Sequence, residues 1–90
     1  MSRFDWDPVK AEANFRKHGV TFDEAGEMLE TDECEERPDA RHSLGEGRVR
    51  TIGYAPGEAV IVVITSTGGR RPRIISAQRA TKRECDEYVG

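Results

Sequence analysis

The chain has 90 residues, of which 36% are hydrophobic and 34% are charged. A chain of this length has room for one small core, so we expect a single domain over residues 1–90. Its longest apolar run is far shorter than the ~20 residues that cross a bilayer, and its start has no apolar signal-peptide segment. We therefore expect a cytoplasmic protein that does not enter the membrane.

The net charge of −3 hides an uneven distribution of charged residues. Residues 1–47 contain 6 Lys or Arg against 13 Asp or Glu, a net of −7, whereas residues 48–90 contain 8 against 4, a net of +4. Two interpretations stay open. The basic half offers a face to a phosphate-bearing partner, or the two halves neutralise each other within the fold.

Neither the cysteines nor the histidines predict a metal site. Cys34, Cys85, His18 and His42 show none of the close spacings, such as Cys-x-x-Cys, that hold zinc. Two cysteines in a cytosolic chain are more often free thiols than a disulfide. We therefore expect neither a metal nor a cofactor.

Two weakly patterned segments predict short strands. Residues 3–7 alternate between polar and apolar types, which favours a first strand with Phe4 and Trp6 facing inward. Residues 32–38 are acidic and end at Pro38, a pattern typical of an edge strand or an extended segment.

The first predicted helix has signals at both ends. Asp7 suits the N-cap and Pro8 the first helical position, so we expect a helix over residues 9–18 that ends at Gly19. Helical spacing predicts an apolar side made of Ala11, Phe15 and His18. For His18, a role at the helix end is favoured over a catalytic one.

A second helix follows after a tight turn. Thr21 and Glu24 have the spacing of a capping box, and the helix should run to about Glu30. Its apolar side consists of Ala25, Met28 and Leu29. The two helices form an αα-hairpin that can cover one face of a sheet.

Three β-rich runs in the second half predict the body of that sheet. They begin at Arg48, Glu58 and Arg70, and short turns separate them. Residues 60–64 are apolar on both faces, so we place this run at the centre. A second capping box, from Thr81 to Glu84, predicts a C-terminal helix.

The expected fold class is therefore α+β, in the order strand, helix, helix, four strands, helix. In this fold a small antiparallel sheet is packed by the N-terminal αα-hairpin and the C-terminal helix. Strand alternation places Arg48 and Arg50 on one face of the first run, and Arg71 and Arg73 on one face of the third. The sheet should thus carry a basic surface.

The sequence has no Ser-His-Asp elbow and no phosphate-cradling Gly loop. The Arg, Lys, His, Glu and Tyr residues of the predicted sheet region suit metal-independent cleavage of RNA instead. The ribose 2′-hydroxyl is then the nucleophile, and the protein moves protons and stabilises charge on phosphorus. The candidates are Glu46 or His42 as base, His42 or Tyr88 as acid, Tyr54 as a base-stacking ring, and Arg48, Arg50, Arg71, Arg73 and Arg79 as phosphate ligands. Binding of nucleic acid or protein without chemistry stays the alternative.

Blocks of residues along nearly the whole chain carry a resemblance to a known family. They are Phe4-Asp5-Trp6-Asp7-Pro8, Lys17-His18-Gly19-Val20, His42-Ser43, Glu46-x-Arg48, Arg73-Ile74-Ile75-Ser76-Ala77 and Ala80-Thr81-x-x-Glu84-x-x-x-Tyr88. In type and order they resemble the BrnT family, the ribonuclease toxins of type II toxin–antitoxin systems.

The resemblance implies a compact relative of the RelE-type toxins that inhibits growth by cleaving RNA. It implies a BrnA-like antitoxin as partner, with a ribbon-helix-helix region that binds operator DNA, in a complex with two copies of each chain. Arg48, Arg73 and neighbouring basic residues would carry the activity. We also expect Lys82 to bind RNA.

One position departs from the family pattern. Family members generally have Arg where this chain has Gln78. Gln can hydrogen-bond a phosphate oxygen but brings no charge. Arg79 is adjacent, yet a shift of one residue in a strand points to the opposite face. Either Arg79 lies where the strand has ended and can reach round, or this chain is an attenuated member that only binds antitoxin or nucleic acid.

Overall fold

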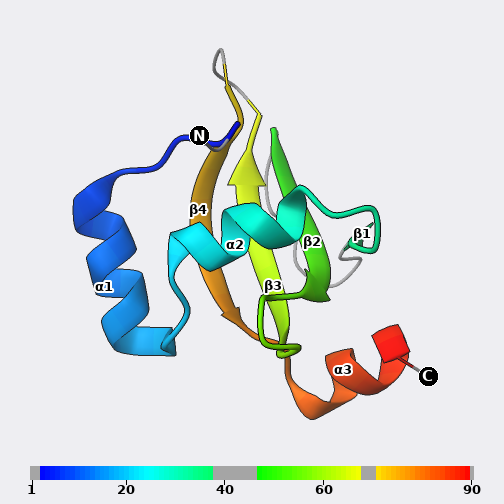
Figure 1. The fold of residues 1–90 in the computed structure, drawn as a ribbon. Helices are drawn as coiled ribbons and strands as arrows, with labels where there is room; N and C mark the ends of the chain where they lie inside the picture. The colour runs from blue at the N-terminus through cyan, green and yellow to red at the C-terminus, as the bar shows by residue number, and fades with distance from the viewer. Residues whose placement is uncertain (1–2, 38–46, 68–70, 90) are drawn as a thin grey trace.

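The computed structural model describes residues 3–37, 47–67 and 71–89. Along the chain lie α1 (Pro8–His18), α2 (Phe22–Leu29), β1 (Glu35–Glu36), β2 (Arg48–Tyr54), β3 (Val60–Ser66), β4 (Arg73–Arg79) and α3 (Lys82–Val89) (Figure 1). This confirms the expected α+β class and, after the first segment, the expected order of elements.

The strands form one antiparallel sheet in the order β1-β2-β3-β4, so β3 lies inside it as predicted. The turn between β2 and β3 uses positive φ angles, 92° at Gly57 and 71° at Glu58. β1 has only two residues, Glu35 and Glu36, and pairs with β2 at the edge. A short, charged edge strand discourages association of sheets from different molecules.

A β-bulge adjusts β4 to its neighbour. Ile64 is opposite Ser76, but Thr65 is opposite Ile74, which leaves Ile75 as an extra residue in β4. Without that extra residue, Ile74 would face away from the core. With it, Ile74 shares the face of Thr65 and is 2% exposed.

The predicted first strand is reduced to a single bridge. Asp5 pairs in parallel with Arg73: its N–H donates to the carbonyl of Pro72 (3.0 Å), and its own carbonyl accepts from the N–H of Ile74 (2.8 Å). The pairing does not extend because Asp7, two residues later, already caps α1.

Local signals begin α1 and α2, and end α1, as predicted. Oδ1 of Asp7 accepts the N–H of Val9 (2.9 Å), and Gly19 ends α1 with a φ of 73°. At the start of α2, the N–H of Glu24 donates to Oγ1 of Thr21 (3.0 Å), and Oε1 of Glu24 accepts the N–H of Thr21 (3.3 Å).

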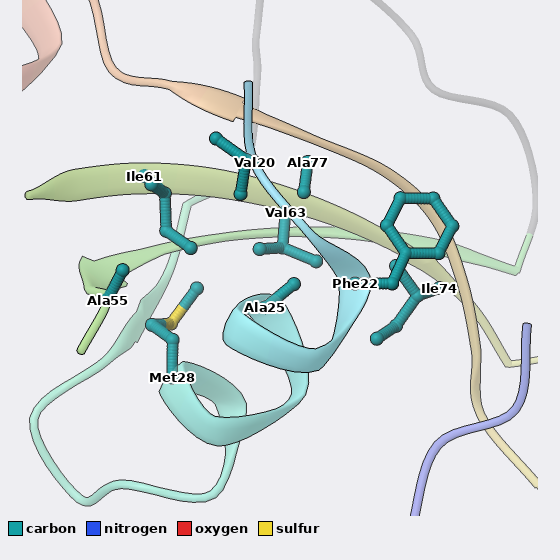
Figure 2. Close-up of a cluster of buried hydrophobic side chains, with 9 residues drawn as sticks. All are labelled: Val20, Phe22, Ala25, Met28, Ala55, Ile61, Val63, Ile74 and Ala77. Carbon is teal, nitrogen blue, oxygen red and sulfur yellow. The ribbon is translucent and has the colours of Figure 1, made fainter. Parts of the chain in front are cut away.

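The hydrophobic core lies between the sheet and the αα-hairpin, with α2 across the sheet and α1 beside β4 (Figure 1). Figure 2 shows its buried members: Val20, Phe22, Ala25, Met28, Ala55, Ile61, Val63, Ile74 and Ala77. Met28 lies so close to Gly53 of β2 that a Cβ there would be 2.7 Å from the Met28 sulfur. Phe4 and Trp6 pack against this core as predicted, and Trp6 meets Phe22 edge to face, with 6.1 Å between ring centroids.

The predicted inner side of α1 is wrong at one position. Phe15 is 51% exposed, and the polar Asn14 is buried instead. Nδ2 of Asn14 donates to the carbonyls of Val20 (3.2 Å) and Ala77 (2.7 Å), while its Oδ1 accepts the N–H of Ala77 (3.2 Å). The Asn14 amide thereby bonds the backbone of β4 as a neighbouring strand would, which satisfies a stretch of that edge beyond the bridge at Asp5.

The C-terminal helix lies apart from the αα-hairpin. α3 is found at the end of the sheet where β2 and β4 end (Figure 1). It begins with the predicted capping box, in which the N–H of Thr81 donates to Oε1 of Glu84 (2.8 Å) and the N–H of Glu84 to Oγ1 of Thr81 (3.1 Å). Its side chains meet β2 on the face of the sheet opposite to α1 and α2.

Candidate functional site

The face of the sheet opposite to α1 and α2, here called the open face, carries most of the predicted arginines. Its members follow from the strand register: Ile61 and Val63 of β3 point into the core, so alternate residues point the other way. The open face consists of Arg48, Arg50, Ile52 and Tyr54 from β2, Val60, Val62, Ile64 and Ser66 from β3, and Arg73, Ser76 and Gln78 from β4.

Arg48 and Arg73 lie in one row across this face. Each is opposite Ser66 of β3, Arg48 from β2 and Arg73 from β4. Their backbones are therefore two strand spacings apart, about 10 Å, a gap over which two extended guanidinium side chains can reach one phosphate. Both are exposed, and neither forms an ion pair with another residue that the structure describes.

Arg50 lies in the next row and is held by α3. Its Nη2 forms an ion pair with Oε2 of Glu84, and the two side chains are 18% and 20% exposed. Oε1 of the same carboxylate accepts the N–H of Thr81. One carboxylate thus serves both the helix start and the ion pair, and the charge of Arg50 is compensated within the fold.

Arg71 does not share a strand face with Arg73, so this prediction is wrong. β4 begins at Arg73, and Pro72, which has no N–H for the sheet, separates Arg71 from it. Nη1 of Arg71 instead bonds Oδ1 of Asp5 at 3.1 Å. Both side chains are about half exposed, so this pair stabilises the fold little.

Two further predicted basic residues lie away from the row of Arg48 and Arg73. Arg79 is opposite Ile61, so it faces the side of α1 and α2 at the end of β4, and Lys82 is exposed at the start of α3. Gln78 is opposite Val62 and is exposed on the open face. Arg79, the last residue of β4, therefore lies on the face opposite to Gln78.

Tyr54 and Tyr88 meet at the opposite end of β2 from Arg48. Their ring centroids are 5.5 Å apart, and the hydroxyl of Tyr88 donates to the carbonyl of Glu33. Burial, and then the negative charge of Glu35, raises the pKa of Tyr88. The rings line an open hollow of about 500 Å³ together with the carboxylates of Asp32, Glu33 and Glu35. These carboxylates repel phosphate, so the surroundings of Tyr54 do not favour RNA.

His42 and Glu46, the predicted proton-transfer residues, lie outside the described residues. Within residues 3–37, 47–67 and 71–89, no group of three or more His, Cys, Asp or Glu is placed to hold a metal ion. Cys34 and Cys85 are free thiols. In the same ranges, every helix is too short or too polar to span a bilayer.

Glu84 and Ser66 belong to this region but were absent from the predicted site. The sequence does signal Glu84, as the third residue of a capping box, yet its second bond to Arg50 depends on how α3 meets β2. Ser66 becomes visible only through the register that places it between Arg48 and Arg73.

Comparisons with known proteins give a consistent result. A family model described as "Ribonuclease toxin, BrnT, of type II toxin-antitoxin system" matches residues 6–84. The fold is similar to the crystal structure of the Brucella abortus ribonuclease toxin BrnT, with a TM-score of 0.67 and 26% sequence identity. That similarity covers 88% of this chain and 96% of the Brucella chain. A comparison with curated proteins finds no match.

Proposed function

Because this chain belongs to the BrnT family of ribonuclease toxins of type II toxin–antitoxin systems, we propose that it is a metal-independent endoribonuclease that inhibits growth by cleaving RNA. The observation that supports this most is the row in which Arg48 and Arg73 flank Ser66. Two exposed guanidinium groups from separate strands, with no carboxylate partner among the described residues, suit a phosphodiester.

The proposed reaction is a transesterification within the RNA strand. The 2′-oxygen of one nucleotide attacks the adjacent phosphorus, and the bond from phosphorus to the 5′-oxygen of the next nucleotide breaks. The products are a 2′,3′-cyclic phosphate and a 5′-hydroxyl. One group takes the proton of the 2′-hydroxyl, and another gives a proton to the leaving 5′-oxygen.

Arg48 and Arg73 would bind the nonbridging oxygens and stabilise the charge that develops on them. The proposed base is Glu46, two positions before Arg48 in the sequence, or His42. His42 is also the proposed acid. Tyr88 is less suited to that role, because its hydroxyl already donates to a backbone carbonyl.

A second candidate is an attenuated member that binds antitoxin or nucleic acid without cutting. The observation that favours it is Gln78, which lies on the open face with an uncharged side chain while Arg79 faces the other way. A neutral amide supplies weaker hydrogen bonds to phosphate than a guanidinium does.

A type II toxin has an antitoxin protein as its partner. We propose that the antitoxin is BrnA-like, with a ribbon-helix-helix region that binds operator DNA, and that the complex contains two copies of each chain. RNA is the proposed substrate of the free toxin.

Incubation of the purified chain with RNA in excess chelator tests the proposed activity. We expect fragments that end in 2′,3′-cyclic phosphate, and none from a preparation that carries both Arg48→Ala and Arg73→Ala. Intact RNA would contradict the nuclease, and equal cutting by the double variant would point to a contaminant. Induced expression with and without the neighbouring small reading frame, scored for growth arrest, tests neutralisation.

A further inference from the structure

Glu84 is the one described carboxylate that forms an ion pair with an arginine of the open face. Its Oε2 pairs with Arg50, and both side chains are about four-fifths buried, so little water lies between the charges. By contrast, the side chains of Arg83 and Glu87, an ion pair within α3, are 71% and 60% exposed. Such exposed pairs contribute little to the stability of the fold. The pair of Arg50 and Glu84 thus differs from the surface ion pairs in being largely shielded from water.

The Glu84 carboxylate is also fixed from the helix side. Its Oε1 accepts the N–H of Thr81 at 2.8 Å, and the N–H of Glu84 donates back to Oγ1 of Thr81 at 3.1 Å. A side chain held in this way loses little conformational entropy when it meets Arg50. It is therefore a preorganised anion, placed where the chain would otherwise present a cation.

Without Glu84, Arg50 would add a third cation beside the row of Arg48 and Arg73. It lies two residues after Arg48 on the same face of β2, a separation of about 7 Å. Successive phosphates of a single strand are separated by a similar distance, so Arg50 is placed to bind the phosphate next to the one at Arg48. Among the described residues, the carboxylate of Glu84 is the one that forms an ion pair with Arg50.

We propose that Glu84 is an internal competitor of RNA phosphate for Arg50 and thereby sets the RNA affinity of the open face. This inference rests on the proposed function. The α3 helix holds the Glu84 carboxylate against Arg50. RNA gains a further phosphate contact only when a phosphate replaces Glu84 at Arg50. Glu84 is a positioning residue in this scheme, because it acts through Arg50 and does not touch the reacting atoms.

The variant Glu84→Gln removes the charge and keeps the helix start, since Gln also serves at the N3 position of a capping box. One additional phosphate contact steepens the logarithmic salt dependence of single-strand binding by about 0.7. If the free energy of that contact falls to zero at 1 M salt, the same slope predicts that E84Q binds RNA about fourfold more tightly than the wild type at 0.15 M salt.

The control is Asp86→Asn, which makes the same change in net charge at an exposed position of the same helix. The probe is a single-stranded 2′-O-methyl RNA oligonucleotide, which lacks the nucleophile and stays intact during titrations by fluorescence anisotropy. We expect E84Q, and not D86N, to show the fourfold gain and the steeper slope. In a chain that also carries Arg50→Gln, the two variants should have equal effects, because no arginine is left to release.

The outcomes separate this inference from the proposed function. Equal affinities and slopes for E84Q and D86N, with a wild type that binds RNA, would overturn the inference alone. No binding by the wild type with binding by E84Q would count against the wild-type function and support the competition. No binding by either chain would overturn both.

If E84Q unfolds at a lower temperature than the wild type, an NMR measurement on the wild type tests the inference. The Nε–H signal of Arg50, identified by its loss in Arg50→Gln, should shift less than those of Arg48 and Arg73 when 2′-O-methyl RNA is added to the wild type, because Glu84 holds Arg50. A shift of the Arg50 signal as large as those of Arg48 and Arg73 would show that Glu84 does not keep phosphate from Arg50 and would overturn the inference.

Discussion

At the scale of single residues, the arginines that the sequence predicts as phosphate ligands do not all lie on the open face. Arg48 and Arg73 flank Ser66, whereas Arg79 faces the side of α1 and α2. We expect Arg48→Ala or Arg73→Ala to lower the initial rate of RNA cleavage by about 100-fold, the typical loss when one donor to a developing oxyanion is removed. Arg79→Ala should change the rate less than twofold. A loss in R79A equal to that in R73A would show that the face is misassigned.

The residue at position 78 tests how far the chain is attenuated. Gln78→Arg places a guanidinium on the open face opposite Val62, one row from Arg50. We expect this variant to raise both RNA cleavage and growth arrest on induction, because a guanidinium binds phosphate through two charged donors. Gln78→Lys is the matched control, since it adds the same charge without the forked geometry. An unchanged rate in Q78R would remove the argument that Gln78 limits activity.

Alternation along strands predicts such faces well only where the strand itself continues. It placed Arg48 and Arg50 correctly because β2 is regular over its whole length. It failed for Arg71 because Pro72 delays the start of β4. The ion pair of Arg50 and Glu84 was beyond prediction, since it depends on the angle at which α3 leaves the sheet.

At the scale of elements, Asn14 joins α1 to β4 where the sequence predicts only an apolar helix side. Its amide satisfies the N–H and the carbonyl of Ala77, and all three groups are buried. Asn14→Ala should lower the free energy of unfolding by about 1–3 kcal/mol, the cost of leaving buried polar groups without partners. For a domain of this size that is a fall in Tm of at least about 4 °C.

The neighbouring Phe15 supplies the comparison for that measurement. It is half exposed on the same helix, so Phe15→Ala should change the free energy of unfolding by less than ~0.5 kcal/mol, as is usual at surface positions. Thermal melts followed by circular dichroism distinguish the two variants. A larger loss in F15A than in N14A would contradict the assignment of the inner side of α1.

Helix ends were the most predictable part of the fold. Asp7, Gly19, Thr21 and Thr81 act as expected because a cap is decided within four residues of chain. The bridge at Asp5 and the bulge at Ile75 were not predictable in the same way. Both depend on pairing between segments that are distant in the sequence, which local composition does not encode.

At the scale of the whole molecule, β2 separates two charged regions. Arg48 stands at its start and Tyr54, beside the hollow with Asp32 and Glu33, at its end, about 20 Å away. This distance is about twice the Debye length of ~8–10 Å at physiological salt, so the acidic end should hardly affect a phosphate bound at the other. Asp32 and Glu33 therefore do not cancel the charge of Arg48 at the open face.

The salt dependence of RNA binding measures this separation directly. Because Arg48 and Arg73 are proposed to bind one phosphate together, the affinity for 2′-O-methyl RNA should fall with salt with a logarithmic slope of about −0.7 from that contact. Arg48→Ala should make this slope shallower. The double variant Asp32→Asn, Glu33→Gln removes two charges at the acidic end and should leave the slope unchanged. A stronger effect of this pair than of Arg48→Ala would mean that RNA reaches the tyrosines, as the stacking role predicted for Tyr54 requires.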